Sequence, residues 1–192
     1  MKEATDLIAL FRQKRALLEG HFLLTSGLHS DRYFQCALLL QEAPLATELG
    51  AQLAAALRAS GAACDVVIGP ALGGILVAHE VARALGLRSL FAERSGGAMS
   101  LRRGFRIEPG QRVLVVEDVV TTGGSVGEVL DLVQTLGGVP VAVGCLVDRS
   151  GGATRFPVPF RALVQLEAAS YQADQCPLCR AGTPAVKPGS RS

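Results

Sequence analysis

The sequence lacks the features that mark nucleic-acid-binding and membrane proteins. It has no tryptophan, only 5% aromatic residues, and 19 basic residues against 17 acidic ones. No basic run is interleaved with aromatic residues, so the cationic surface that phosphate backbones require is missing. No apolar stretch reaches membrane-spanning length before a charge or a glycine interrupts it, and the polar first residues are unlike a secretory signal. We therefore expect no nucleic-acid partner, no membrane association and a cytoplasmic location.

Cysteine is scarce, with five residues, and most of them have no recognisable spacing. Cys36, Cys64 and Cys145 are isolated in apolar surroundings, which is typical of small buried side chains. Cys176 and Cys179 form a Cys-Pro-Leu-Cys pair, which is half of a four-ligand zinc site. Zinc would need a second pair from another subunit or from elsewhere in the chain. A disulfide and two free thiols remain open as alternatives.

Histidine is scarcer still, with three residues. His21, His29 and His79 have no evident ligand partner at a metal-binding spacing. We interpret His21 and His79 as structural residues, and His29 as a weak candidate for a ligand pocket. The histidines therefore predict no metal site of their own.

The chain is long enough for one compact domain, and its 49% hydrophobic residues can bury a core. After Pro44 the sequence alternates between helical and extended patterns. The expected helices are Leu45–Ala59, Ile75–Leu85 and Ser125–Leu136, and the expected strands are Asp65–Gly69, Arg88–Ala92, Arg112–Glu117, Val139–Val147 and Arg161–Leu166. Continuous runs of Val, Ile and Leu indicate strands that are buried on both faces. The pattern predicts an α/β core over residues 43–170, with a mainly parallel sheet flanked by helices.

The segments on either side of this core have different patterns. Residues 1–42 contain an amphipathic pattern that predicts a helix over Thr5–Glu19, followed by extended segments at His21–Leu24 and Arg32–Leu40. These segments would form a small N-terminal layer of a single domain, residues 1–170. Residues 171–192 lose periodicity and gain Pro, Gly and Cys, so we expect an irregular C-terminal extension.

The most informative segment runs from Val113 to Ser125 and reads VLVVEDVVTTGGS. A buried strand leads into Glu117 and Asp118, and a loop of small hydroxyl residues and glycines follows where a helix begins. The N–H groups and hydroxyls of residues 121–125 would converge on one point, where the helix dipole favours a phosphate dianion. The acidic pair lies at a distance suited to the hydroxyls of a ribose whose phosphate occupies this loop. The alternative is an acidic pair that only caps a helix; the Walker and dinucleotide-binding glycine patterns are absent.

This segment resembles the signature of the type I phosphoribosyltransferases, which bind phosphoribosyl pyrophosphate with an acidic pair and a Thr/Gly/Ser loop. The wider chain is similar to the orotate phosphoribosyltransferase family within that group. The similarity rests on His21–Gly27 with Tyr33–Phe34, on Gly69–Gly74, on Arg102–Gly104 and on Asp148–Arg149. It implies the type I fold with a small N-terminal hood. It also implies transfer of ribose 5-phosphate from phosphoribosyl pyrophosphate to orotate, giving orotidine 5'-monophosphate and pyrophosphate in pyrimidine biosynthesis.

The resemblance further implies a cofactor, a partner and roles for individual residues. Mg²⁺ would assist the reaction, and in a homodimer a mobile loop of one subunit would cover the neighbour's site. Asp118 and the loop residues Arg102 and Arg103 would be catalytic. The substrates would be bound by Thr25, Tyr33, Phe34, Ala71, Arg94, Glu117, Asp118, Val119, Val120, Thr121, Thr122, Gly123, Gly124, Ser125 and Arg149. Thr121 and Arg149 would contact orotate, and Arg149 could pair with its carboxylate.

Departures from the family pattern leave the base open. Thr25 and Gly73 stand where lysines are common, and the loop after Arg94 offers arginines instead of several lysines and a histidine. The accepted base could therefore be a purine or uracil. A regulator that senses phosphoribosyl pyrophosphate without transferring it is a further alternative.

The arginines also have simpler interpretations. Arg149 could be a surface residue paired with Asp148, since arginines at strand ends are often solvated. Arg102 and Arg103 could be a solvated charge cluster. The glycines around them favour a lid that closes over the site.

Overall fold

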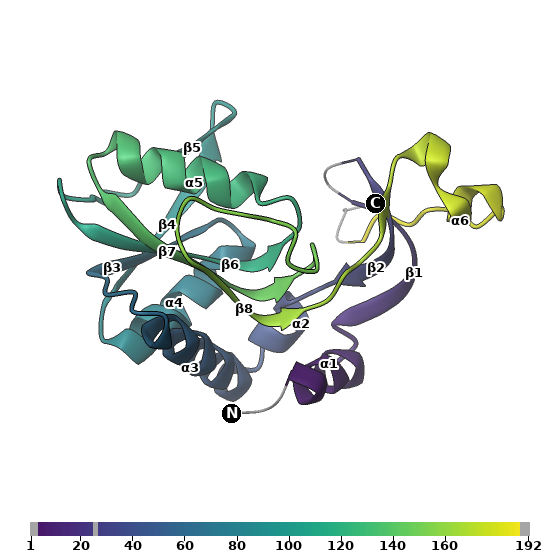
Figure 1. The fold of residues 1–192 in the computed structure, drawn as a ribbon, viewed down its shortest axis with the longest axis horizontal. Coiled ribbons are helices and arrows are strands. Elements are labelled where there is room, and N and C mark those ends of the chain that lie inside the picture. Colours follow the sequence, from purple (N-terminus) through teal and green to yellow (C-terminus); the bar gives the residue numbers. More distant parts are fainter. Residues whose placement is uncertain (1–3, 25–26, 189–192) are drawn as a thin grey trace.

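A computed structural model describes residues 4–24 and 27–188 of the chain, and Figure 1 shows their arrangement. A six-stranded sheet forms the centre of the molecule, and a three-stranded sheet forms a separate layer beside it. We call this second sheet, with strand order β1-β2-β9, the hood.

The central sheet has the strand order β5-β4-β3-β6-β7-β8. Its strands are β3 (Val66–Pro70), β4 (Arg88–Ser95), β5 (Ala98–Leu101), β6 (Arg112–Val120), β7 (Val139–Asp148) and β8 (Phe160–Gln165). All neighbours are parallel except β4 and β5, which form an antiparallel hairpin at one edge. The predicted α/β fold with a mainly parallel sheet is confirmed.

Helices cover both faces of this sheet (Figure 1). They are α3 (Ala43–Ala59) and α4 (Gly73–Leu85) on one face, and α5 (Gly124–Thr135) on the other. Val67 and Leu114 are buried with α3 and α4, whereas Ile68 and Val115 are buried with α5. Successive side chains of a strand point to opposite faces, so the continuous Val, Ile and Leu runs fill two apolar layers at once.

The N-terminal part contains α1 (Ala4–Gln13), β1 (Leu17–Leu23), β2 (His29–Phe34) and the short helix α2 (Ala37–Leu40). The predicted helix to Glu19 was wrong, because α1 ends at Gln13 and Arg15 has a φ of 54°. This left-handed conformation interrupts a right-handed helix. Leu17 therefore begins β1, which pairs antiparallel with β2, and the predicted extended segment to Leu40 ends as a helix instead.

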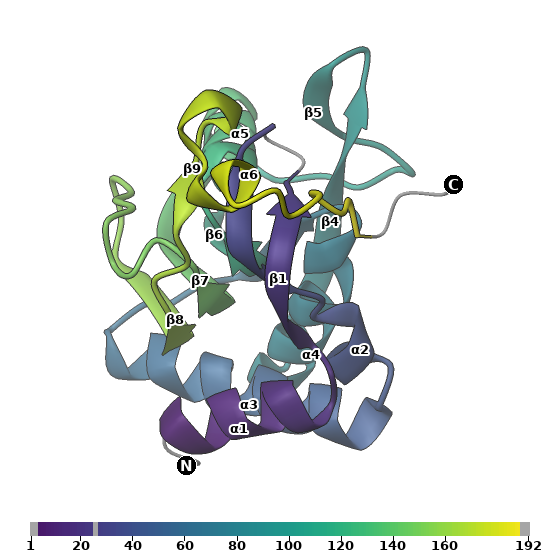
Figure 2. The same ribbon diagram turned by 90° about the vertical axis from the view of Figure 1, so that its right-hand side faces the viewer.

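The C-terminal segment is more ordered than the irregular extension that the sequence predicts. Strand β9 (Ser170–Tyr171) pairs with β2, and a 3-10 turn (Ala173–Gln175) and helix α6 (Pro177–Arg180) follow. Val186 then returns to β1, where its N–H donates to the His21 carbonyl and its carbonyl accepts from the Leu23 N–H. Figure 2 shows this tail running across β1. Among the described residues, no helix has the length and apolar character needed to cross a membrane.

Candidate active site

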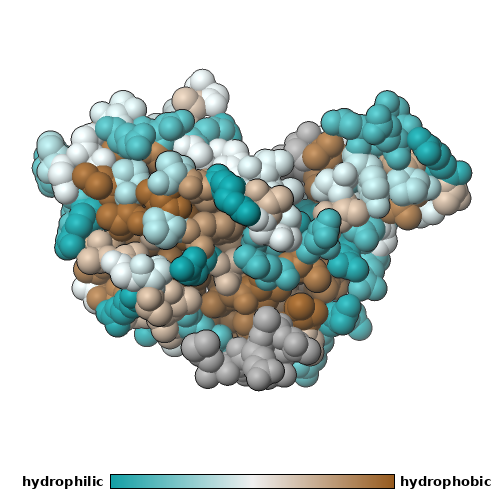
Figure 3. Space-filling view, in the orientation of Figure 1, coloured by the Kyte–Doolittle hydropathy of each residue, from teal (hydrophilic) through white to brown (hydrophobic). Residues whose placement is uncertain are grey.

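A cavity of about 450 Å³ lies between the carboxyl end of the central sheet and the hood. Figure 3 shows a notch in the surface at this boundary, with the core on the left and the mainly hydrophilic tail on the right. The lining residues are Leu24, Tyr33, Phe34, Arg94, Glu117, Asp118, Val119, Val120, Thr121, Thr122, Gly123, Gly124, Ser125, Val126, Glu128 and Arg149. The structure thus brings together the predicted substrate-binding residues except Ala71 and Thr25; Thr25 lies outside the described residues. Parallel sheets commonly bind ligands at this edge.

The acidic pair lies at the end of β6 itself, within the strand. Glu117 is 8% exposed, and its Oε1 accepts a 3.1 Å hydrogen bond from the Asp118 N–H. Burial, followed by the neighbouring Asp118 carboxylate, raises the pKa of Glu117 well above its ordinary value of 4.5. Burial also raises the pKa of Asp118, although the N–H of Val119 donates to its Oδ1 at 2.8 Å. A bound cation or hydroxyl donors would stabilise the charged form of this pair and so lower the two pKa values again.

The loop after β6 has the geometry of an anion site. Helix α5 starts at Gly124, and Gly123 before it has a φ of 81°, with no side chain capping the helix. The first N–H groups of the helix therefore have no side-chain partner at the cap and could bind an anion. A Cβ at Gly123 would lie 2.9 Å from the Phe156 ring, so both conformation and space require glycine there. The Thr154 hydroxyl donates to the Thr121 carbonyl at 3.0 Å and holds the loop from the side.

The start of α4, directly after the loop from β3, packs against the acidic pair. Ala71 lies in the loop between β3 and α4 and does not line the cavity. A Cβ at Gly73 would lie 2.5 Å from Asp118 Oδ1, and one at Gly74 would lie 3.1 Å from Glu117 Oε1. The glycine backbone at the start of α4 therefore closes one side of the site, and it limits where the two carboxylates can lie.

Arg149 is a buried residue of the cavity wall, with 5% of its surface exposed. Its Nη2 donates to Ser30 Oγ at 2.8 Å and to the Arg32 carbonyl at 2.9 Å. Its Nε has no hydrogen-bond partner in the part of the chain that the structure describes. Asp148 does not pair with it and instead accepts hydrogen bonds from the turn that follows. Burial lowers the pKa of Arg149, so a ligand carboxylate would stabilise its charge.

Tyr33 and Phe34 reach the cavity from the end of β2. The Phe34 ring lies 6.0 Å from the Arg149 guanidinium, and the Tyr33 ring lies 5.8 Å from that of Phe22. Burial, followed by the Asp118 charge, raises the pKa of Tyr33, so its hydroxyl remains a neutral donor. Both rings contribute to the hood side of the cavity lining.

The predicted lid forms a β-hairpin. Gly96 and Gly97 join β4 to β5, and both have positive φ, as two-residue hairpin turns require. Arg94 in the hairpin stem lines the cavity and forms a 2.6 Å ion pair with Glu128.

Arg102 and Arg103 follow this hairpin and are not among the residues that line the cavity. Arg103 forms a 3.2 Å ion pair with Glu93, and its guanidinium lies 5.6 Å from the centre of the Phe91 ring. Both arginines are exposed. The structure therefore does not bring them to the acidic pair, and their predicted role stays a prediction.

Comparison with known proteins identifies this arrangement. The phosphoribosyl transferase domain family matches residues 39–158, which is more than half of the chain. The chain belongs to this family. A phosphoribosyltransferase from Carboxydothermus hydrogenoformans, described as an orotate phosphoribosyltransferase, is 58% identical over 97% of this chain and 97% of its own length. The orotate phosphoribosyltransferase of Pelotomaculum thermopropionicum is also 58% identical, with the same coverage.

Solved phosphoribosyltransferase structures have the same fold. The orotate phosphoribosyltransferase of Aeropyrum pernix matches with a TM-score of 0.69 and 26% identity, over 83% of this chain and 93% of that one. The enzyme of Mycobacterium tuberculosis, solved in complex with inorganic phosphate, matches with a TM-score of 0.64 and 28% identity, over 85% and 95% of the two chains.

Three further residues of this phosphoribosyltransferase line the cavity although the sequence did not single them out: Leu24, Val126 and Glu128. Val126 and Glu128 lie in the first turns of α5, so helical spacing from the glycine loop could have indicated them. Leu24 follows β1 and had no chemical signal of its own.

Proposed function

We propose that this chain transfers ribose 5-phosphate from phosphoribosyl pyrophosphate to orotate, giving orotidine 5'-monophosphate and pyrophosphate. Relatives described as orotate phosphoribosyltransferases are 52–58% identical to it over nearly its whole length. The observation that supports orotate within the family is the buried Arg149, whose Nε lacks a partner among the described residues. A base with a carboxylate would match this cation, whereas an uncharged base would leave it unmatched.

Phosphoribosyl pyrophosphate would be held at its two ends. The N–H groups at the start of α5 and the hydroxyls of Thr121 and Ser125 would bind the 5-phosphate. The carboxylates of Glu117 and Asp118 would accept hydrogen bonds from the ribose hydroxyls. Residues Gly69–Gly74 would meet the pyrophosphate, because Gly73 and Gly74 at the end of this segment pack against the acidic pair.

The donor chemistry of this site fits Mg²⁺. Glu117 and Asp118 supply hard oxygen atoms beside the space for the substrate, and Mg²⁺ usually combines few carboxylates with substrate phosphates and waters. Once bound with the substrate, the ion would neutralise charge on the pyrophosphate leaving group.

Breaking the bond between C1 of the ribose and pyrophosphate develops positive charge on the sugar and negative charge on the leaving group. Asp118 would stabilise the sugar, and Arg149 would orient the base through the carboxylate of the base. Tyr33 and Phe34 would cover the base and exclude water from it. The reacting groups would thus be held in line, which supplies much of the rate enhancement in such transfers.

The proposal includes a homodimer in the cytoplasm. Arg94 lines the cavity within its own chain, whereas Arg102 and Arg103 would reach the site of the neighbouring subunit and stabilise the departing pyrophosphate. A lid from the neighbour would account for their position away from the cavity of their own chain.

A panel of bases assayed with phosphoribosyl pyrophosphate and Mg²⁺ tests the proposal. Orotate should be converted and uracil should not. Arg149→Gln should lower kcat/KM for orotate by about two orders of magnitude, because a charged hydrogen-bond partner of the carboxylate is lost. Arg161→Gln, which removes an exposed arginine of β8, is the matched control and should leave kcat/KM unchanged. Equal rates with uracil, or preference for a purine, would contradict the orotate assignment.

A further inference from the structure

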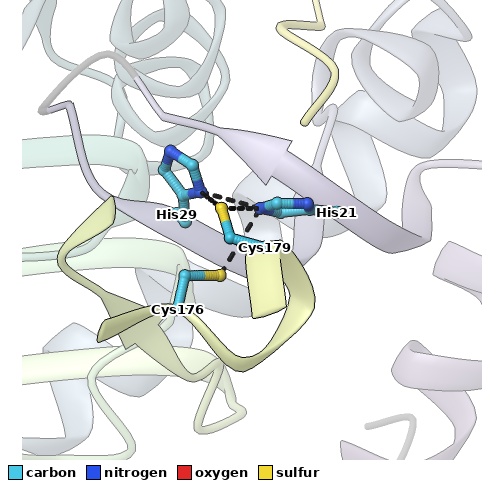
Figure 4. Close-up of side chains that lie close together, drawn as sticks. All are labelled: His21, His29, Cys176 and Cys179. Atoms are coloured by element: carbon cyan, nitrogen blue, oxygen red, sulfur yellow. Dashed lines mark hydrogen bonds between the residues drawn. The ribbon is translucent and has the colours of Figure 1, made fainter. Parts of the chain in front are cut away.

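Four side chains from distant parts of the sequence meet on the outer side of the hood. His21 comes from β1, His29 from the start of β2, and Cys176 and Cys179 from the beginning of α6 and from the helix itself. Figure 4 shows their nitrogen and sulfur atoms directed toward one another. One ligand atom from each residue lies within 4.8 Å of all the others. The sequence did not reveal this group, because the histidines and cysteines are far apart along the chain.

The distances resemble the edges of a tetrahedron around one ion. His21 Nε2 lies 3.5 Å from Cys176 Sγ and 3.8 Å from Cys179 Sγ, and His29 Nδ1 lies 3.3 Å from Cys179 Sγ. Zinc bonds of about 2.0 Å to nitrogen and about 2.3 Å to sulfur give nitrogen–sulfur edges of about 3.5 Å in a tetrahedron. The two nitrogens are 2.7 Å apart, so an ion would need them to separate by about 0.6 Å.

The hydrogen bonding of His21 prepares it as a ligand. Its Nδ1 lies 2.6 Å from the Thr183 carbonyl, which can only accept a hydrogen bond, so Nδ1 carries the proton. Nε2 is then left with a free electron pair that faces the cluster. A backbone carbonyl that fixes the tautomer in this way is the usual support of a histidine bound to a metal. Thr183 belongs to the same tail as the two cysteines.

The surroundings also suit a zinc ion with two thiolates and two imidazoles. Cys176 is fully buried, His21 and His29 are 4% and 9% exposed, and Cys179 lies at the exposed edge of the group. Two thiolates balance the charge of Zn²⁺, so the loaded site would be neutral and could be buried at low cost. Soft sulfur with imidazole nitrogen in a tetrahedral set selects zinc over Mg²⁺.

We propose that His21, His29, Cys176 and Cys179 form a structural zinc site that fastens the C-terminal tail to the hood. The site is closed, with four protein ligands and no position for a substrate. It lies apart from the catalytic cavity, because none of its ligands lines that cavity. Strand β2 links the zinc site to the cavity. His29 precedes Ser30, whose hydroxyl accepts a hydrogen bond from Arg149 and donates one to the Ala169 carbonyl, just before β9.

Metal analysis of the tag-free chain tests the proposal without an activity assay. The protein, purified without chelators and incubated with Zn²⁺ alone before desalting, should retain about one zinc per chain. After removal of zinc, Co²⁺ should give the absorption of a tetrahedral ion with thiolate ligands. Thermal stability should fall on chelation and return with Zn²⁺.

Variants distinguish this site from unspecific binding. Cys176→Ser combined with Cys179→Ser should abolish zinc retention, and His29→Gln should weaken it. Cys64→Ser and His79→Gln remove a cysteine and a histidine outside the cluster, so they should retain zinc as the unmodified chain does.

Three outcomes would overturn the proposal. The first is a chain that retains far less than one zinc while both thiols react freely with a thiol reagent. The second is a disulfide between Cys176 and Cys179, detected by mass spectrometry of the protein purified under nitrogen. The third is equal zinc retention by the double serine variant. Circular dichroism of the double serine variant checks that it is folded, so that a loss of zinc retention can be assigned to the missing ligands and not to unfolding.

Discussion

At the scale of a single residue, Glu117 would support substrate binding but lowers the free energy of unfolding of the empty protein. Its carboxyl group is buried beside Asp118, which raises its pKa, so the folded protein favours the protonated form. The stability that this proton provides is complete below the ordinary pKa of 4.5, and it is lost as pH rises through the raised value. Substrate hydroxyls or a cation would instead stabilise the charged form. The residue therefore reduces the stability of the empty enzyme at neutral pH.

Glu117→Gln should separate these two effects. The amide resembles the protonated acid at every pH, so the unliganded variant should melt at a higher temperature than the unmodified chain at pH 8. Near pH 4.5 the two melting temperatures should converge. At pH 8 the variant should also have a lower kcat/KM for phosphoribosyl pyrophosphate, since a charged acceptor is lost. Glu108→Gln, at an exposed position, serves as the control. A melting difference that does not change with pH would refute this account of the pair.

Among the structural elements, the glycine-bearing start of α4 positions the acidic pair from outside the cavity. Gly73→Ala would place a methyl group 2.5 Å from Asp118 Oδ1 unless the carboxylate moves. We expect KM for phosphoribosyl pyrophosphate to rise roughly tenfold, while stability changes by less than about 1 kcal/mol, because only a side chain must shift. Gly127→Ala in α5, where a Cβ meets nothing within 4 Å, is the matched control. An unchanged KM would show that Asp118 tolerates the displacement.

How far the elements could be predicted depends on how local their signals are. The strands and helices of the core follow from continuous apolar runs and helical spacing, and α3, α4 and α5 begin and end within a few residues of the prediction. The β4–β5 hairpin was mistaken for a loop, although Gly96 and Gly97 between two extended segments are a local hairpin signal. The tail was mistaken for an irregular extension because β9 and Val186 are ordered only by contact with the hood. No local pattern records such a contact.

The candidate site shows the same dependence. The acidic pair and its glycine loop form one continuous segment, so their proximity could be predicted from the sequence. That Arg149 contacts Ser30 and Arg32 could not, since the hood and the core are joined only in the folded chain. The placement of Gly73 against Asp118 likewise required the structure.

For the whole molecule, the placement of Arg102 and Arg103 outside their own cavity leads to a test of the dimer. An Arg102→Ala/Arg103→Ala chain and an Asp118→Asn chain should each be inactive. Mixed and allowed to exchange, they should recover about a quarter of normal activity, because half of randomly formed dimers are hybrids and each hybrid has one complete site. Mass spectrometry would verify that the hybrids have formed. Verified hybrids as inactive as their parents would mean that the loop acts within its own subunit or only aids solubility.

The hood sheet has a consequence for synthesis on the ribosome. It joins the first two strands of the chain to the last one, whereas the strand and loop for the ribose phosphate lie in the middle of the sequence. A nascent chain can assemble most of the central sheet before Ser170 and Tyr171, the β9 partners of β2, have been synthesised. Ala169 is also synthesised late; its carbonyl accepts a hydrogen bond from the Ser30 hydroxyl, which in turn accepts one from Arg149. The side of the cavity that would bind the base, with Arg149, is therefore completed after the side that would bind the sugar phosphate.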